Sequence, residues 1–225
     1  FWLNYPVRLG SLDSRPPGAD LMCSRSFLVG SVPFTLHFVG VGRLSEECRD
    51  NLILPMFPRG VMRAAIISRY GEPNVFELVD LPAPTPGDGD VLVDVWASSV
   101  NPIDWKIRKG AQRLFIRYKL PWVLGLDFSG VVSAVGAGVS GFSEGDEVFG
   151  CADYKRPGCY AEQVVVAASA LAKKAPSLSH EQAASLPLAG LTAWQCLYDT
   201  ARVTSGQQVF IQAGSGGVGT LAIQL

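Results

Sequence analysis

The sequence holds few of the residues on which metal sites and disulfide frameworks depend. Its 225 residues include two histidines, His37 and His180, and five cysteines, none spaced as a CxxC pair. An odd number of cysteines argues against a disulfide framework and favours reduced thiols in a cytosol-like compartment. A zinc site built from cysteine and histidine would find few ligands at the usual spacings, so we expect no metal.

Charged residues are also scarce, at 17% of the chain, and the formal net charge is -1. This balance gives no electrostatic reason to expect nucleic acid or an anionic membrane as a partner. Hydrophobic residues make up 48%, which supplies a packed core and argues against wholesale disorder. The apolar run after Met22 is short and is interrupted by Pro33 and His37, which argues against a membrane-spanning helix.

Residues 1–61 contain six arginines and no lysine, and they show no clear helix or strand period. Three interpretations stay open: upstream sequence that is not native to the protein, which we favour; a targeting peptide starting at Met22, against which the acidic residues count; or an additional domain. We expect a cytoplasmic protein, with organelle targeting by residues 1–61 as the open alternative.

A regular pattern begins at Met62. Short apolar runs alternate with glycine- and proline-rich turns, which is typical of a β-rich barrel or sandwich. The predicted strands cover residues 63–68, 75–82, 91–100, 127–139 and 159–168. From Ser179 the character changes, because Ser179 and Gln182 form a capping box that predicts a helix ended by Pro187. A second helix over 191–203 and a strand over 208–212 follow, so we place a domain boundary near residue 185.

The glycines Gly214, Gly216 and Gly219 match GxGxxG between this predicted strand and an apolar helix. The first permits a tight turn, the second lets a pyrophosphate approach the backbone, and the third lets helix and strand pack closely. The helix start adds free N–H groups and partial positive charge. A loop that only connects strand and helix is the alternative. The predicted cofactor contacts are Gly214, Ser215, Gly216, Gly217, Val218 and Gly219.

Six segments in order resemble the medium-chain dehydrogenase/reductase superfamily, in particular its zinc-independent quinone and enone reductases. They are NPIDWK at 101–106, GLDFSGVV at 125–132, GDEVFG at 145–150, GCYAEQVVV at 158–166, PLAGLTAW at 187–194 and AGSGGVG at 213–219. The resemblance implies an α/β plus β protein. Residues 62–185 would form a GroES-like β-barrel domain, and residues 186–225 would begin a Rossmann domain that relatives continue beyond Leu225.

The resemblance also implies a function: hydride transfer from NADPH to a quinone or an α,β-unsaturated carbonyl without zinc. Zinc alcohol dehydrogenases have a cysteine near Asn101 and a His-Glu pair near Leu126 and Asp127, and this sequence has neither. A non-catalytic NADPH-binding relative and, less favoured, a zinc alcohol dehydrogenase-like enzyme are the alternatives. NADH stays open as cofactor, because the residue that would contact the ribose 2′ group lies beyond Leu225. A homodimer is compatible with the family.

The candidate catalytic residues are Asn101, Asp104 and Lys106. By resemblance, the amide of Asn101 would face cofactor or substrate. Asp104 would order the loop or cap the following helix, and Lys106 would donate to the forming enolate or belong to a solvated basic face. Thr192 would hydrogen-bond near the nicotinamide. We expect His180 at the surface. The aromatic residues Trp105, Phe115, Tyr118 and Trp122 are expected mainly in the core, with one or two lining an apolar pocket.

Overall fold

The computed structural model describes residues 22–29, 32–39, 60–114 and 116–225, and the chain divides into two compact units. The smaller unit, residues 5–54, contains an antiparallel hairpin of β1 (Met22–Val29) and β2 (Val32–Val39). Sequence analysis had found no strand pattern there, so the hairpin is a finding of the structure. The rest of residues 1–59, and with it the interpretation of this segment, lies outside the described residues.

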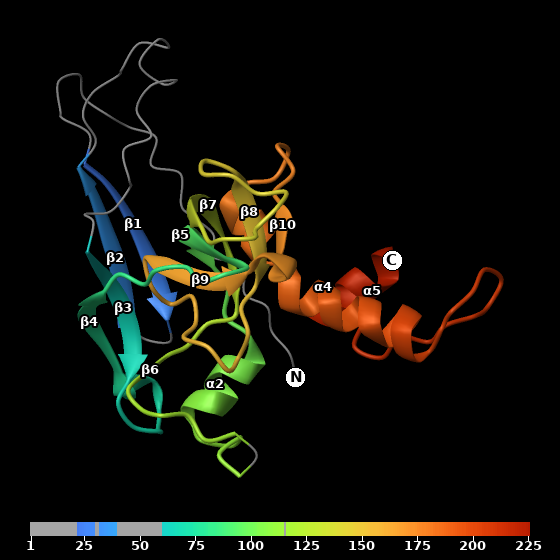
Figure 1. Cartoon of the computed structure of the whole chain (residues 1–225). Helices are drawn as coiled ribbons and strands as arrows, with labels where there is room; N and C mark the ends of the chain where they lie inside the picture. Colours follow the sequence, from blue (N-terminus) through green and yellow to red (C-terminus); the bar gives the residue numbers. More distant parts are fainter. Residues whose placement is uncertain (1–21, 30–31, 40–59, 115) are drawn as a thin grey trace, which may run out of the picture. The chain divides into compact units, whose positions relative to one another are not determined.

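The described residues of the larger unit form two antiparallel sheets and four helices (Figure 1). Its strands are β3 (Val61–Ile67), β4 (Phe76–Pro82), β5 (Asp90–Ser98), β6 (Trp122–Val123), β7 (Asp127–Val135), β8 (Glu147–Cys151), β9 (Gln163–Ala167) and β10 (Leu171–Lys173). Its helices are α2 (Pro102–Arg108), α3 (His180–Ala184), α4 (Pro187–Trp194) and α5 (Gly217–Gln224), with shorter helical turns η1 (Pro73–Val75), η2 (Ala168–Ala170) and η3 (Gln195–Thr200).

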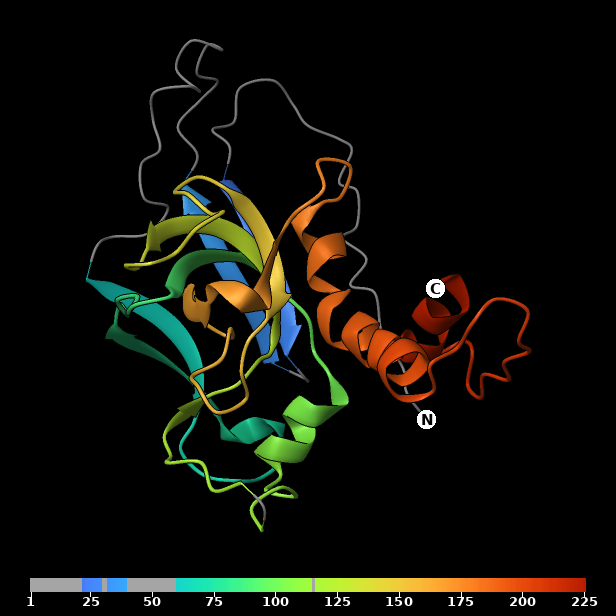
Figure 2. The same cartoon turned by 45° about the vertical axis from the view of Figure 1, so that its right-hand side comes forward.

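The five-stranded sheet has the order β10-β8-β7-β5-β9, and the three-stranded sheet has the order β4-β3-β6. Backbone hydrogen bonds connect them: Ala65 N–H donates to Tyr160 O at 2.7 Å, and Glu162 N–H donates to Arg63 O at 2.9 Å. Each of the five strands predicted between residues 63 and 168 overlaps an observed one. The β-rich domain is therefore confirmed, and its two sheets continue into each other through the segment that precedes β9 (Figure 2).

The core lies on the inner face of the five-stranded sheet. Val91 and Val93 of β5, Phe128 of β7 and Val148 of β8 are each 0% exposed and belong to one cluster. β-Branched side chains suit this position, because they pack well on a pleated surface and lose little rotamer freedom there. The sheet fixes where β5 ends and where β7 begins, and the candidate site lies next to these two points.

The helical segment begins where the sequence predicts it. Ser179 N–H donates to Gln182 Oε1 at 2.9 Å and Gln182 N–H donates to Ser179 Oγ at 3.2 Å, which confirms the capping box at the start of α3. The sequence predicts that Pro187 ends this helix. In the structure, Pro187 instead opens α4 as its first residue. The expectation was wrong because proline fits a first turn, where its missing N–H would have no intrahelical partner.

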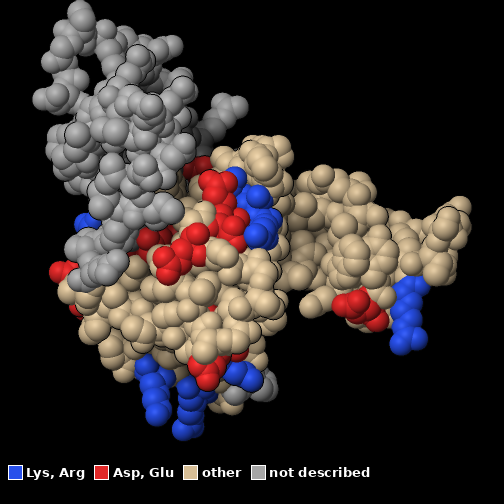
Figure 3. Space-filling view, turned by 45° about the horizontal axis from the view of Figure 1, so that its top comes forward, with Lys and Arg blue, Asp and Glu red and all other residues tan. Residues whose placement is uncertain are grey.

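The predicted strand over 208–212 is not formed, and this is a second correction. Phe210 is 91% exposed and Val209 is 47% exposed. A strand of a Rossmann sheet needs a neighbouring strand to receive its backbone hydrogen bonds, and within the described residues none pairs with this segment. Residues 187–225 carry two charged side chains, Asp199 and Arg202, and this part of the surface is largely tan in Figure 3.

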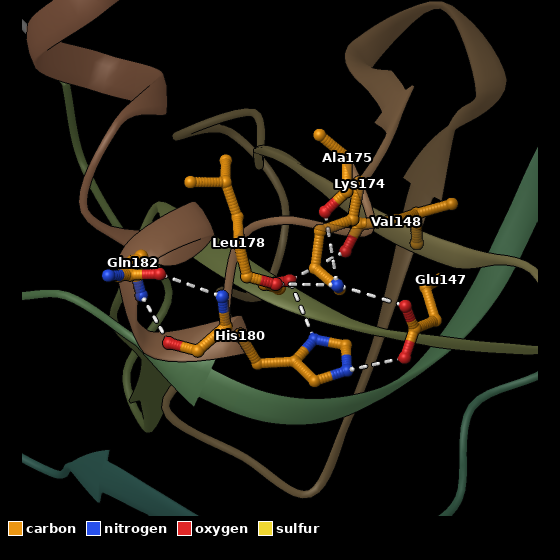
Figure 4. A network of polar contacts seen from close by, with 9 residues as sticks. Glu147, Val148, Lys174, Ala175, Leu178, His180 and Gln182 are labelled. Atoms are coloured by element: carbon orange, nitrogen blue, oxygen red, sulfur yellow. Dashed lines mark hydrogen bonds and ion pairs between the residues drawn. The ribbon is translucent and has the colours of Figure 1, made fainter.

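His180 is not a surface residue, in contrast to the expectation. Its side chain is 11% exposed and its ring stacks on Trp96 at 5.1 Å between centroids. Ser129 Oγ donates to Val148 O at 2.9 Å, so its 2.8 Å contact with His180 Nδ1 requires Nδ1 to carry the proton. Glu147 lies 3.5 Å from His180 Nε2 and receives an ion pair from Lys174 at 2.9 Å (Figure 4).

Burial lowers the pKa of His180, because the charged imidazolium loses solvation. The network thus attaches α3 to β7 and β8 through the His180 ring. The position of His180 in a first helical turn suggested exposure, but this turn lies directly on the sheet. Within the described residues, no helix has both the length and the apolar character needed to cross a membrane.

Gly219 allows α5 to approach the preceding loop. A Cβ at this position would lie 2.3 Å from Ala213 O and 2.8 Å from Gly214 Cα, both of them backbone atoms. We therefore expect Gly219→Ala to lower the free energy of unfolding by about 1–3 kcal/mol, although alanine is ordinarily the better helix former.

Gly190→Ala is the matched control, because its Cβ would meet only Leu221 Cδ1, at 3.8 Å. Helix propensity should make this variant neutral or more stable. Thermal unfolding followed by circular dichroism compares the two. Equal melting temperatures for both variants would contradict the close approach at Gly219.

Candidate active site

A cavity of about 770 Å³ lies between the start of α2, one side of α4 and the start of α5. Its polar wall includes Asn101, Thr192 and residues 216–219. Its apolar wall includes Ile103, Ile107, Ile116, Leu126 and Leu197. Three segments that the sequence analysis singled out, 101–106, 187–194 and 213–219, therefore line the same cavity although they lie far apart in the sequence.

The start of α2 places Asn101 and Asp104. Asn101 is the N-cap, Pro102 is the first helical residue and Asp104 is the third, and the Asp104 side chain caps the backbone N–H of Asn101. Asp104 Oδ2 accepts from Asn101 N–H at 2.7 Å and from the Tyr160 hydroxyl at 3.0 Å. Asp104 is 3% exposed and is not among the residues that line the cavity. Its position is that of the helix cap, the alternative considered from the sequence.

Tyr160 reaches Asp104 because residue 125 is a glycine. Gly125 has φ +96°, and a Cβ there would lie 2.3 Å from the Tyr160 ring. A side chain at this position would be strained and would displace the ring. The glycine of the GLDFSGVV segment therefore serves the buried hydrogen bond between Tyr160 and Asp104.

The orientation of the Asn101 amide is fixed by a buried carboxylate. Asn101 Nδ2 donates to Asp127 Oδ2 at 2.8 Å and to Ser99 Oγ at 3.3 Å, while Ser99 Oγ donates to Asp127 Oδ2 at 3.1 Å. Both amide hydrogens are thereby used. Asn101 can offer a ligand only its carbonyl Oδ1, which is a hydrogen-bond acceptor with two lone pairs.

Thr192 also presents an acceptor. Its Oγ1 donates to Leu188 O at 2.7 Å within α4, which leaves the lone pairs of the hydroxyl for a ligand. Lys106 lies outside the cavity wall; it is half-buried, and its Nζ is 5.7 Å from the centroid of the Trp105 ring. Asn101 and Thr192 therefore both line the cavity, whereas Lys106 and Asp104 do not.

The glycine-rich turn enters the cavity through residues 216–219, whereas Gly214 and Ser215 are not part of the lining. Thr220 N–H donates to Gly216 O at 2.8 Å, so the amides of Gly217, Val218 and Gly219 precede the first intrahelical hydrogen bond. Ala213, just before the turn, has φ 58°. Backbone donors and partial positive charge at a helix start suit a phosphate group, so the donor set fits a dinucleotide.

Two buried carboxyls dominate the electrostatics beside the cavity. Desolvation, with a smaller contribution from the charge of Asp127, raises the pKa of Asp104 to about 7 against hydrogen bonds from Asn101 and Tyr160. Desolvation likewise raises the pKa of Asp127 to about 6, against hydrogen bonds from Asn101, Leu188 and Ser99. No group of three or more histidine, cysteine or acidic side chains is arranged to hold a metal in the part of the chain that the structure describes.

The aromatic residues divide as expected only in part. Tyr118 lines the cavity, and its ring lies tilted against that of Trp122 at 5.1 Å between centroids. Trp105 is 43% exposed, and Phe115 lies outside the described residues. Sequence reasoning missed the structural roles of Asp127 and Tyr160. An available signal was the acidic residue that opens the apolar strand DFSGVV, since a carboxylate at a buried strand end needs donors from elsewhere.

The β-rich domain thus holds the Asn-Pro-x-Asp turn at 101–104 beside the glycine-rich turn that opens α5. Residues 87–176 match the family described as the alcohol dehydrogenase GroES-like domain. The chain belongs to the medium-chain dehydrogenase/reductase superfamily, with a GroES-like domain followed by the start of a Rossmann domain. Several of the relatives and solved structures that it resembles are named quinone oxidoreductases.

Among curated relatives, a chloroplast envelope quinone oxidoreductase homolog of Arabidopsis thaliana is 38% identical over 171 residues, covering 73% of this chain and 52% of the relative. A zinc-type alcohol dehydrogenase-like protein of Staphylococcus aureus is also 38% identical, over 160 residues, covering 68% of this chain and 46% of the relative. The chain thus spans about half the length of these relatives.

Solved structures agree with this assignment. A quinone oxidoreductase from Coxiella burnetii is 45% identical with a TM-score of 0.66, covering 73% of this chain and 52% of that protein. A mycobacterial protein complexed with NADPH is 36% identical with a TM-score of 0.63, covering 72% of this chain and 48% of that protein.

The raised pKa of Asp104 predicts a pH dependence of stability. Because the folded-state pKa, about 7, lies above the ordinary value of 3.8, the folded protein binds this proton more tightly than the unfolded chain does. The stability that the folded protein gains from a protonated Asp104 is therefore fully present below about pH 4, and it is lost as the pH rises to about 7. We expect the loss to be about 2–4 kcal/mol.

Asp104→Asn removes this dependence while its Oδ1 can still accept from Asn101 N–H and the Tyr160 hydroxyl. Urea unfolding at a series of pH values measures the effect. The variant should lose less stability than the native chain between pH 4 and pH 8. If the free energy of unfolding fell with pH equally in the variant and the native chain, Asp104 would not carry the buried proton.

Proposed function

We propose that the full-length protein is an NAD(P)H-dependent oxidoreductase that transfers a hydride from NADPH to a quinone or an α,β-unsaturated carbonyl without zinc. The observation that carries the proposal is the single cavity in which Asn101, Thr192 and the start of α5 face an apolar wall. The quinone oxidoreductase relatives and the NADPH-complexed neighbour support it. When bound, the nicotinamide supplies the hydride, and the protein supplies binding and orientation.

Each wall of the cavity has a definable task in this proposal. The amides of residues 217–219 bind the pyrophosphate. The acceptors Asn101 Oδ1 and Thr192 Oγ1 match donors on the cofactor, namely ribose hydroxyls or the carboxamide NH₂. Ile103, Ile116 and Leu197 offer apolar surface to a flat, weakly polar acceptor and exclude water from the transfer.

Zinc independence rests on the side chains at the expected ligand positions. Asn101 turns its Nδ2 to Asp127, and Leu126 has no ligating atom. An electron-poor quinone or enone accepts a hydride without a Lewis acid, which makes such acceptors the proposed substrate class. Stoichiometric zinc in the purified full-length protein would instead favour the zinc alcohol dehydrogenase alternative. Cytoplasmic location and a homodimer stay predictions, and one relative is named for the chloroplast envelope.

The full-length protein should oxidise NADPH in the presence of 1,4-benzoquinone or butenone, followed by loss of nicotinamide absorbance. Asn101→Ala should reduce kcat/KM by on the order of 10-fold, the effect of one oriented hydrogen bond, while NADPH still binds. Lys106→Ala tests the donor role assigned from the sequence, since that residue lies outside the cavity wall. A protein that binds NADPH and reduces neither acceptor would favour the non-catalytic alternative.

The chain of residues 1–225 alone should bind NADPH weakly or not at all. Residues 208–212 form no strand, and Phe210 is 91% exposed, so the loop before α5 has no rigid support. Ordering that loop on binding costs free energy that the phosphate contacts must offset. Fluorescence titration with NADPH measures this, and a micromolar Kd for this chain would contradict the expectation.

A further inference from the structure

Asp127 is bonded to both sides of the cavity. It is 0% exposed and lies at the first position of β7. Its Oδ2 accepts from Asn101 Nδ2 at 2.8 Å and from Ser99 Oγ at 3.1 Å. Its Oδ1 accepts from the backbone N–H of Leu188 at 2.9 Å. One carboxylate therefore joins the turn before α2 to the first turn of α4.

The donors to Asp127 are neutral. No ion pair to Asp127 is present among the described residues, and its pKa is raised by desolvation. Leu188 is the second residue of α4, so its N–H belongs to the group of free amides at a helix start, where a negative charge is favoured. A buried carboxylate held in this way is costly, and a purely apolar junction would avoid the cost.

The two elements that Asp127 joins each carry a side-chain acceptor of the cavity wall. Asn101 takes its amide orientation from Asp127, and α4 carries Thr192 one helical turn beyond Leu188. We propose that Asp127 is a positioning residue, which sets the Asn101 amide and the start of α4 in one register so that both acceptors face the same ligand. Its effect on catalysis rests on the proposed function, whereas the tether itself does not.

Asp127→Asn separates positioning from stability. The new amide keeps the shape, but its NH₂ must face either Asn101 Nδ2 or Leu188 N–H, so one donor loses its acceptor. Because desolvation penalises the charged carboxylate, the substitution should leave the melting temperature unchanged or higher at pH 8. In the full-length protein, kcat/KM for quinone reduction should nevertheless fall by 10- to 100-fold.

Asp94→Asn is the matched control. Asp94 is also a buried carboxylate, 5% exposed, in the neighbouring strand β5, but it accepts from Gln163 Nε2 at 2.8 Å and does not line the cavity. This variant should keep the native kcat/KM. Native kcat/KM in Asp127→Asn, or an equal loss in both variants, would overturn the proposal.

The tether can be measured without turnover. In the full-length protein labelled with ¹⁵N-leucine, the Leu188 amide resonance should shift with a midpoint near pH 6, where Asp127 takes up its proton. The other titratable groups near Asp127 are Asp104, Cys151, Cys159 and Tyr160. Among these, the raised pKa of about 7 makes Asp104 the group that titrates nearest to this range.

The Leu188 shift should persist in Asp104→Asn and vanish in Asp127→Asn. A Leu188 resonance that titrates in Asp127→Asn would overturn the tether whatever the activity. If the native full-length protein reduces neither acceptor, the proposed function fails, and this titration still decides the tether. If it reduces them and Asp127→Asn does so equally well, the positioning role fails and the proposed function stands.

Discussion

The arrangement of the site depends on neutral donors that converge on buried carboxylates. Asp104 and Asp127 lie at the end of the sheet, both almost without exposure, and their hydrogen bonds come from an amide side chain, hydroxyls and backbone N–H groups. A carboxylate in such surroundings retains its charge only at a free-energy cost, which the raised pKa values express. The three segments that supply the donors must therefore stay together for the charge to be tolerated, and this requirement fixes the cavity.

The sheet makes that convergence rigid. Phe128 follows Asp127 directly and is fully buried among Val91, Val93 and Val148, so the strand cannot shift without opening the core. Gly125, just before β7, leaves room for the Tyr160 ring, and Tyr160 completes the contacts of Asp104. On the other side, Ser129 and His180 attach α3 to the same strand. Strand β7 thus holds the polar cluster, the core and the start of the helical segment within three consecutive residues.

Features that depend on local sequence were predictable, and features that depend on distant partners were not. The capping box of Ser179 and Gln182 and the glycine turn each follow from residues within a few positions of one another, and the structure contains both. The burial of His180 depends on Trp96 and Ser129, which lie far away in the chain. Pro187 is ambiguous by itself, because proline both ends and begins helices. The segment 208–212 has the composition of a strand, but a strand requires a neighbour. The role of Asp127 was hidden because its partners come from two other segments.

The polarity of the cavity wall has a chemical consequence. The oriented side chains Asn101 and Thr192 have already used their hydrogens within the protein, so they present lone pairs, and the start of α5 adds backbone donors. Acceptors that are fixed in this way select hydroxyl and amide hydrogens, which a dinucleotide carries on its ribose and carboxamide groups. A quinone carries no such hydrogens, so under the proposed function it would be held mainly by the apolar wall. Contacts of this kind are tolerant of shape, because dispersion and burial are non-directional. The same cavity would then be selective for its cofactor and tolerant of different acceptors. This difference arises because Asp127 already accepts from the Asn101 amide and Leu188 O already accepts from the Thr192 hydroxyl.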